Sequence, residues 1–181
     1  MKKMIFSLLI VLPLTLLGGC GNVVDDAHAG KWSLKNFTLL IDGKERKGSI
    51  TPVGHIKISA NGKVEEKTIN GDVKSTADYK LEPVDEKGKY RLTGDYKKSI
   101  TLPYKTDLDK EFAKSTLADL KSSEELSDVS GKEKNGEYRI EYTQKFSTGI
   151  RINLKFKNKT LVQTQFNKNY GNAKSTSIFT K

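Results

Sequence analysis

The amino-acid sequence predicts a mainly β protein, in which an antiparallel meander forms a barrel or half-barrel accompanied by a single short α-helix. The first indication is a set of dipeptides, Asp42-Gly43, Asn61-Gly62 and Asn70-Gly71, which favour tight hairpin turns and separate short runs with β-branched residues. The second is a recurring alternation of apolar and polar residues with the period of a strand. The third is that only one stretch has the spacing of an amphipathic helix.

The alternation is first seen in the middle of the chain. Apolar side chains share one parity in two successive segments: Tyr90, Leu92 and Tyr96 in residues 89–97, and Ile100, Leu102 and Tyr104 in residues 99–104. A strand that places apolar residues at every second position buries one face and leaves the other in water. Both segments are therefore predicted to be half-buried strands.

The amphipathic stretch follows directly and extends from Asp107 to Lys121. Thr106 and Asp109 have the spacing of a capping box, which marks a helix start. The apolar residues expected on one side of this helix are Phe112, Ala113, Leu117 and Leu120. Such a helix more often plugs or covers a sheet than carries chemistry, and we expect that role here.

The clearest strands lie after the helix. Apolar side chains alternate in two further segments: Tyr138, Ile140 and Tyr142 in residues 137–142, and Ile150, Ile152, Leu154 and Phe156 in residues 150–157. With residues 160–166 after the turn at Asn158 they predict a three-stranded meander, and residues 175–181 supply a closing strand. Together with Trp32, these side chains are the candidate lining of a ligand cavity, or else the core of a filled barrel.

The first 19 residues have the features of a secretory signal peptide. Lys2 and Lys3 precede an apolar run from Ile5 to Leu17, which is too short for the roughly 20 helical residues that a membrane span requires. The sequence LLGGC that ends at Cys20 resembles the lipobox of bacterial lipoproteins. This resemblance implies cleavage before Cys20, acylation of its sulfur and anchoring to the outer face of the cell membrane; the alternative is an ordinary secreted protein with a free thiol.

The domain division follows from this cleavage. Residues 1–19 are expected to be removed, and residues 20–30 are expected to form a flexible tether because they contain small and acidic residues without a sustained period. Residues 31–181 then form a single β-rich domain, a length that suits one hydrophobic core.

Composition restricts the function. Cys20 is the only cysteine, so disulfides are excluded, and His28 and His55 are the only histidines, so we expect neither a metal site nor a cofactor. The chain has a formal net charge of +10, carried mainly by lysine. Arginine, which reads nucleic acids by paired hydrogen bonds, is scarce, so a nucleic-acid partner is not expected. The lysines suit either anionic headgroups or wall polymers, or simply a solvated surface, and their abundance suggests a Gram-positive cell.

A second resemblance rests on the motif GKW, residues 30–32, at the start of the first strand. It resembles the Gly-x-Trp signature of lipocalins and related calycins, in which the tryptophan closes one end of an antiparallel barrel beneath a basic side chain. The resemblance implies a barrel that binds small hydrophobic molecules in its interior. Arg139 or Arg151 is the candidate for the basic side chain. Because a helix precedes about three of the predicted strands, another meandering barrel or a curved half-barrel is the alternative.

Catalytic motifs are absent from the sequence, and the protein is not expected to be an enzyme. Alternation places His55 opposite Ile56 and Ile58, at the surface or rim, while Glu65 and Glu66 lie near a turn where solvated carboxylates are usual. The sequence therefore favours a membrane-anchored binding module for a small apolar or amphiphilic ligand. The alternative is a protein-interaction module, such as a hydrolase inhibitor or an accessory to a membrane sensor.

Overall fold

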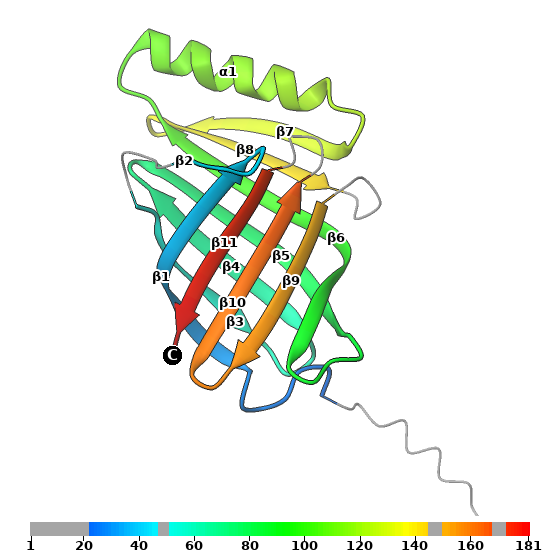
Figure 1. Ribbon diagram of the computed structural model, residues 1–181. Coiled ribbons are helices and arrows are strands. Elements are labelled where there is room, and N and C mark those ends of the chain that lie inside the picture. Colours follow the sequence, from blue (N-terminus) through cyan, green and yellow to red (C-terminus); the bar gives the residue numbers. More distant parts are fainter. Residues whose placement is uncertain (1–21, 47–50, 145–149, 168–172) are drawn as a thin grey trace, which may run out of the picture.

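The computed structural model describes residues 22–46, 51–144, 150–167 and 173–181 (Figure 1). The described residues form one helix, α1 (Asp107–Lys121), and eleven strands: β1 (Gly30–Ile41), β2 (Lys44–Arg46), β3 (Val53–Ile58), β4 (Lys63–Asn70), β5 (Val73–Pro83), β6 (Lys89–Pro103), β7 (Leu126–Lys134), β8 (Glu137–Gln144), β9 (Ile150–Lys157), β10 (Thr160–Asn167) and β11 (Ala173–Thr180). The predicted signal peptide and Cys20 lie outside the described residues.

Eight of these strands close into an antiparallel barrel. In chain order they are β1, β3, β4, β5, β6, β9, β10 and β11; each is hydrogen-bonded to the next, and β11 pairs with β1 to close the ring. The predicted fold class is confirmed, and the barrel is closed rather than half-open. This up-and-down order is consistent with a lipocalin-like barrel.

Helix α1 belongs to an insertion between two barrel strands, formed by α1, β7 and β8. The lower part of β6 pairs with β9 through Lys89–Arg91, whereas its upper part pairs with β8 from Tyr96 to Pro103. The sheet β6-β8-β7 therefore extends beyond the barrel wall, and α1 lies across it (Figure 1). The helix thus interrupts the chain without interrupting the barrel.

The capping box that starts α1 is present, since Thr106 accepts from the backbone N–H of Asp109 and the Asp109 side chain accepts from that of Thr106. The helix packs on β7 and β8 through Ala113, Leu117 and Leu120, against Tyr138 and Ile140. Its close approach requires Gly131 in β7, where an added Cβ would lie 2.6 Å from the Leu117 side chain. The expectation for Phe112 is wrong: it is 66% exposed, because the sheet reaches only the other side of the helix.

The lower half of the barrel is a packed core, and we call it the floor core. Its largest fully buried side chains are Trp32, Ile56, Ile58, Leu92, Ile152, Leu154, Leu161, Val24 and Val64, joined by Tyr79, Leu81, Tyr90, Phe156 and Phe179. Aromatic rings meet at its lower end, where Phe156 lies edge-on to Trp32 at 5.4 Å and to Tyr90 at 5.6 Å between ring centroids. Space at this end of the barrel is filled by large side chains.

Residues 22–29 form a strap across the floor, and the expectation of a flexible tether over residues 20–30 is wrong for this described part. Val24 is fully buried in the floor core, and its N–H donates to the carbonyl of Ala60 at 3.0 Å. The His28 ring stacks on Phe156 with centroids 4.2 Å apart. The strap therefore belongs to the folded domain, since the buried Val24 side chain and hydrogen bonds between the strap backbone and the barrel hold it in place.

Trp32 lies in the floor as the motif GKW predicts. Its indole N–H donates to the carbonyl of His28 at 2.9 Å, and the side chain is 1% exposed. The cation above the ring is Lys181, whose Nζ lies 5.0 Å from the ring centroid and also donates to the carbonyl of Ala27. The expectation of Arg139 or Arg151 is wrong, because Arg139 pairs with Glu141 on the insertion and Arg151 points outward.

Candidate functional site

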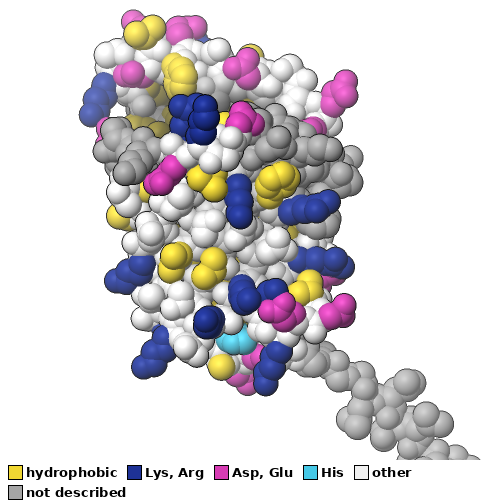
Figure 2. Space-filling model, in the orientation of Figure 1, with side chains coloured by type: hydrophobic (Ala, Val, Ile, Leu, Met, Phe, Trp, Pro, Cys, Tyr) yellow, Lys and Arg dark blue, Asp and Glu magenta, His cyan; other side chains and the backbone are white. Residues whose placement is uncertain are grey.

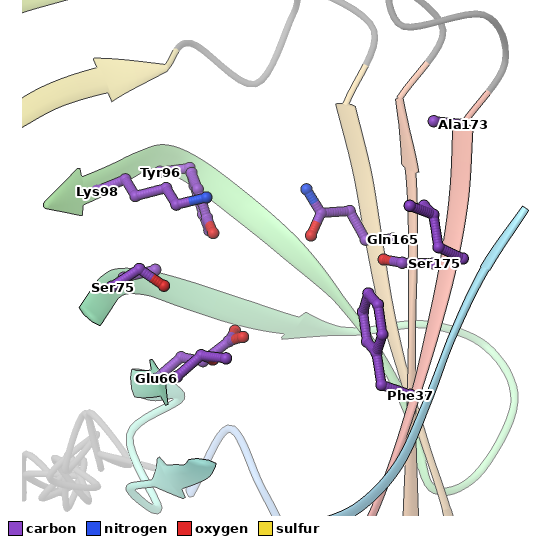
Figure 3. A pocket seen from close by; sticks show the side chains of 11 residues that line it. Phe37, Glu66, Ser75, Tyr96, Lys98, Gln165, Ala173 and Ser175 are labelled. Atoms are coloured by element: carbon purple, nitrogen blue, oxygen red, sulfur yellow. The ribbon is translucent and has the colours of Figure 1, made fainter. Parts of the chain in front are cut away.

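The upper half of the barrel interior is hollow. It holds two overlapping hollows of about 320 and 380 Å³, which we treat together as the upper cavity. Both are lined by Phe37, Leu39, Glu66, Thr68, Ser75 and Lys98; Leu34, Ile100 and Phe179 add apolar surface, and Tyr96, Gln165, Ser175 and Ser177 add polar groups. Figure 3 shows Glu66, Ser75 and Lys98 on one wall facing Phe37, Gln165 and Ser175 on the other.

A row of residues across three neighbouring strands explains why one wall is recessed. Glu66 on β4 pairs with Ala77 on β5, and Ala77 pairs with Lys98 on β6, so all three side chains share the inner face. A small residue at the centre of such a row leaves space in the barrel interior. In the floor core, large side chains fill the interior instead. Ala77 is the small residue of this row, and its methyl group separates the two charged side chains.

The opposite wall has the same construction. Ser177 on β11 lies between Phe37 on β1 and Gln163 on β10, and in the next row Ser175 lies between Leu39 and Gln165. A register shift between Leu34 and Asn36 makes this arrangement possible, since it turns Phe37 and Leu39 inward after Trp32 and Leu34. Simple alternation from Trp32 would have turned them outward.

Glu66 lies at the bottom of the upper cavity and is held by hydrogen bonds. Gln163 Nε2 donates to Glu66 Oε2 at 3.0 Å and contacts the Tyr79 hydroxyl, also at 3.0 Å. Burial raises the pKa of Glu66, while the hydrogen bond from Gln163 and the charge of Lys98 act in the opposite direction. Burial also raises the pKa of Tyr79 and Tyr96, so both phenols stay protonated as hydrogen-bond donors.

Lys98 faces Glu66 across Ala77. Among the described residues its ammonium has neither a hydrogen-bond partner nor an ion pair within 4.0 Å. Burial lowers the pKa of Lys98, and the carboxylate of Glu66 opposes that shift. The two charges therefore stabilise one another through space without touching, and the cavity between them can admit a third group.

The sequence-predicted site residues are divided between two places. Trp32, Ile152, Leu154 and Phe156 lie in the floor core, beneath the upper cavity and outside its lining. Tyr138, Ile140 and the half-buried Tyr142 pack with α1 on the insertion. The Ile150 side chain and Cys20 lie outside what the structure describes. Helix α1 makes its main strand contacts with β7 and β8 of the insertion.

Sequence reasoning missed the cavity residues, above all Glu66 and Lys98. Glu66 was expected in a solvated position near a turn, but it lies within β4 and points inward, whereas Glu65 points outward and pairs with Lys63 at 3.3 Å. The alternation of Val64 and Glu66 with their outward neighbours was the available signal. His55 does point away from Ile56 and Ile58, and burial, followed by Lys31 and Lys67, lowers its pKa.

Two further features of the described residues bear on function. No cluster of three or more His, Cys, Asp or Glu side chains is placed to hold a metal ion in the described ranges. No helix in the same ranges is long and apolar enough to cross a membrane. Figure 2 shows Lys and Arg side chains scattered over the visible face of the barrel, interspersed with acidic ones, rather than gathered into one patch.

Comparison with known proteins yields no match of any kind: no family model, no curated protein and no solved structure matches the chain.

Proposed function

We propose that this protein is a membrane-anchored, extracytoplasmic lipoprotein that acts as a non-enzymatic binding module, and that the upper cavity holds a small amphiphilic ligand. The observation that carries the proposal is the hollow upper half of a barrel whose lower half is filled. The larger of its two overlapping hollows, about 380 Å³, lies within the usual range for small-molecule sites. Its lining combines apolar side chains with a few converging polar groups, as such sites do.

The proposed anchor supports an orientation of the cavity. Only Gly21 separates Cys20 from the strap. The strap is held to the floor by Val24 and by the stacking of His28 on Phe156. A lipid on Cys20 would therefore keep the floor close to the membrane. The mouth lies at the opposite end of the barrel, where Val73 and Pro52 line the cavity, so ligand would enter from the side away from the bilayer.

Binding of a neutral apolar fluorophore tests the ligand proposal. The purified mature chain, with Cys20 replaced by Ser so that it remains soluble, is titrated with N-phenylnaphthylamine, and saturable fluorescence enhancement is expected. Ala77→Leu fills the cavity from its wall and should abolish the enhancement. Thr76→Leu, its outward neighbour on β5, should leave it unchanged. Equal binding by wild type and Ala77→Leu would remove the upper cavity as the site.

Membrane fractionation tests the anchor. Cys20→Ala is expected to release the protein from the membrane fraction into the soluble one, because the acyl chains provide the attachment. A Cys20→Ala variant that stayed with the membrane as firmly as wild type would contradict lipid anchoring, whatever the outcome of the ligand titration.

A second candidate function, a protein-interaction module, is favoured by the exposed side chains of α1. Leu108 is 80% exposed and Phe112 is 66% exposed, and they lie one helical turn apart. Exposed apolar pairs of this kind suit a protein partner. The fluorophore titration separates the two candidates. If Ala77→Leu leaves saturable binding unchanged but Phe112→Ser abolishes it, the binding site is the exposed surface of α1 and not the upper cavity.

A further inference from the structure

The two charged groups of the upper cavity are spaced for a ligand, and this inference rests on the proposed function. Glu66, Ala77 and Lys98 lie side by side on β4, β5 and β6. Adjacent strands are about 4.8 Å apart, so the backbones of Glu66 and Lys98 are separated by about 10 Å. The methyl group of Ala77 leaves the space between them open to the cavity.

Neither charge is satisfied by the other. Glu66 accepts from Gln163 and from the Thr68 side chain, which leaves further acceptor positions on its carboxylate. Lys98 has three N–H donors and no hydrogen-bond or ion-pair partner among the described residues. Both side chains are only partly exposed, between the barrel walls, where an unpaired charge is more costly than on the open surface. A ligand that meets both groups would therefore be stabilised at two points.

Apolar surface lies immediately beside this row. Ile100 follows Lys98 on the same face of β6, and Phe37 and Leu39 cover the facing wall. A ligand with only polar groups would leave these side chains without contacts. A ligand with a short apolar chain would place that chain against them while its polar end reached the row below.

We propose that the ligand is a zwitterionic amphiphile, whose anionic group binds Nζ of Lys98 and whose ammonium group binds the carboxylate of Glu66. Its apolar chain lies against Phe37, Leu39 and Ile100. A purely anionic ligand would pair with Lys98 but bring like charge toward Glu66. A purely cationic ligand would satisfy Glu66 and leave Lys98 unpaired. Only a molecule with both charges completes the row.

Four chain-matched probes test the proposal by displacement of the neutral fluorophore: octanol, octanoate, octylamine and 2-aminooctanoate, which is zwitterionic at neutral pH. We expect 2-aminooctanoate to bind most tightly. Lys98→Gln should weaken octanoate and 2-aminooctanoate by about tenfold or more, the usual effect of losing a charge-assisted hydrogen bond, without weakening octylamine. Glu66→Gln should weaken octylamine and 2-aminooctanoate without weakening octanoate.

Matched controls separate charge from folding. Lys97→Gln and Glu65→Gln change the outward neighbours on the same strands and should leave every affinity unchanged. The exchange variant Glu66→Lys/Lys98→Glu presents both charges in reversed order, and it should recover binding of 2-aminooctanoate that Lys98→Glu alone loses. Such recovery shows that the charges act on the ligand, because a merely misfolded cavity would not be rescued.

The outcomes separate this inference from the proposed function. If the four probes bind equally and the single-charge variants change nothing, the zwitterion assignment is overturned while the cavity remains a binding site. Tight binding of octanoate that depends on Lys98 but not on Glu66 also overturns it, in favour of an anionic ligand. If neither the fluorophore nor any probe shows saturable binding, the proposed function itself fails and the inference fails with it.

Discussion

The lower and upper halves of the barrel are formed by the same strands but are filled differently. In the lower half, inward positions carry Trp32, Ile56, Leu154 and similar large side chains, which pack together in the floor core. In the upper half, several inward positions carry small residues, among them Ala77, Ser175 and Ser177, and the larger of the two hollows there measures about 380 Å³. Between β6 and β9 the wall is hydrogen-bonded only in the lower half, through Lys89–Arg91.

This contrast indicates that stability and binding are separated along the barrel axis. Large apolar side chains at one end contribute the burial that stabilises the fold. Small central residues such as Ala77 and Ser175 at the other end leave room and keep polar groups apart. Equivalent substitutions in the two halves should therefore have different consequences, and four experiments test how tightly the upper half and the other parts of the fold are packed.

The largest difference is expected for removal of an aromatic side chain. Trp32→Ala should lower the free energy of unfolding by about 3 to 5 kcal/mol, because it leaves a cavity in the filled floor core. Phe37→Ala, in the upper half where the ring is already 36% exposed, should cost about 1 kcal/mol. Denaturant unfolding of both variants measures the contrast, and equal losses would show that the two halves are packed alike.

Enlarging an alanine should give the next largest difference. Ala113→Leu, on the buried face of helix α1, should cost about 1 to 3 kcal/mol because its surroundings are already filled. Ala77→Leu should cost less than about 1 kcal/mol, because the added atoms enter the upper cavity. Thermal and denaturant unfolding compare the pair. A loss of several kcal/mol for Ala77→Leu would mean that the wall has no room.

Truncation of the strap should have a smaller effect. Val24→Ala removes two buried carbons from the floor core and should cost about 1.5 kcal/mol. Val23→Ala is the matched control, since that side chain is only partly buried, and should cost less. Unfolding curves for the two variants show whether the strap contributes to stability. Indistinguishable curves for Val24→Ala and wild type would restore the picture of a free tether.

The smallest expected effect is the pH dependence of stability that Glu66 in the upper half produces. Burial raises the pKa of Glu66 above its ordinary value of 4.5, so the folded state binds this proton more tightly than the unfolded state. Stability should therefore fall as pH rises from about 4.5 through the raised value. Glu66→Gln should remove this decline, whereas Glu65→Gln should keep it. Unfolding measured across this pH range gives the answer; parallel profiles for all three proteins would contradict burial of the Glu66 charge.

The predictability of the fold differs from that of the site. Alternation and turn dipeptides are local signals, so the strands around Tyr90, Ile140 and Leu154 and the helix with its Thr106 cap followed from neighbouring residues. The cavity depends on which residues of different strands share a row. Glu66 and Lys98 lie far apart in the chain and meet through Ala77 only once the register of β4, β5 and β6 is fixed. Local patterns do not contain that register.

The same limit explains the misplacement of the C-terminal apolar residues. Tyr138 and Leu154 belong to segments that alternate equally well in sequence, yet Tyr138 packs under α1 and Leu154 lies in the floor core. The pairing of β6 determines these two locations. Its lower part pairs with β9, which carries Leu154, and its upper part pairs with β8, which carries Tyr138. The strap was missed for a similar reason: the N–H of Val24 bonds to the distant Ala60, and the Val23 side chain lies close against the distant Gly62.

Local sequence signals were sufficient for the class of fold, the position of the helix and its cap, the place of Trp32 at one end of the barrel and the resemblance to a lipobox at Cys20. These features depend on residues near one another in the chain, where turn preference, capping and side-chain period act directly. The closure of the barrel, its filled lower half and hollow upper half, and the placement of Glu66 opposite Lys98 emerged only in three dimensions. They depend on strand register and on a bulge in β1, which arise when distant segments compete to bury their apolar faces in one interior.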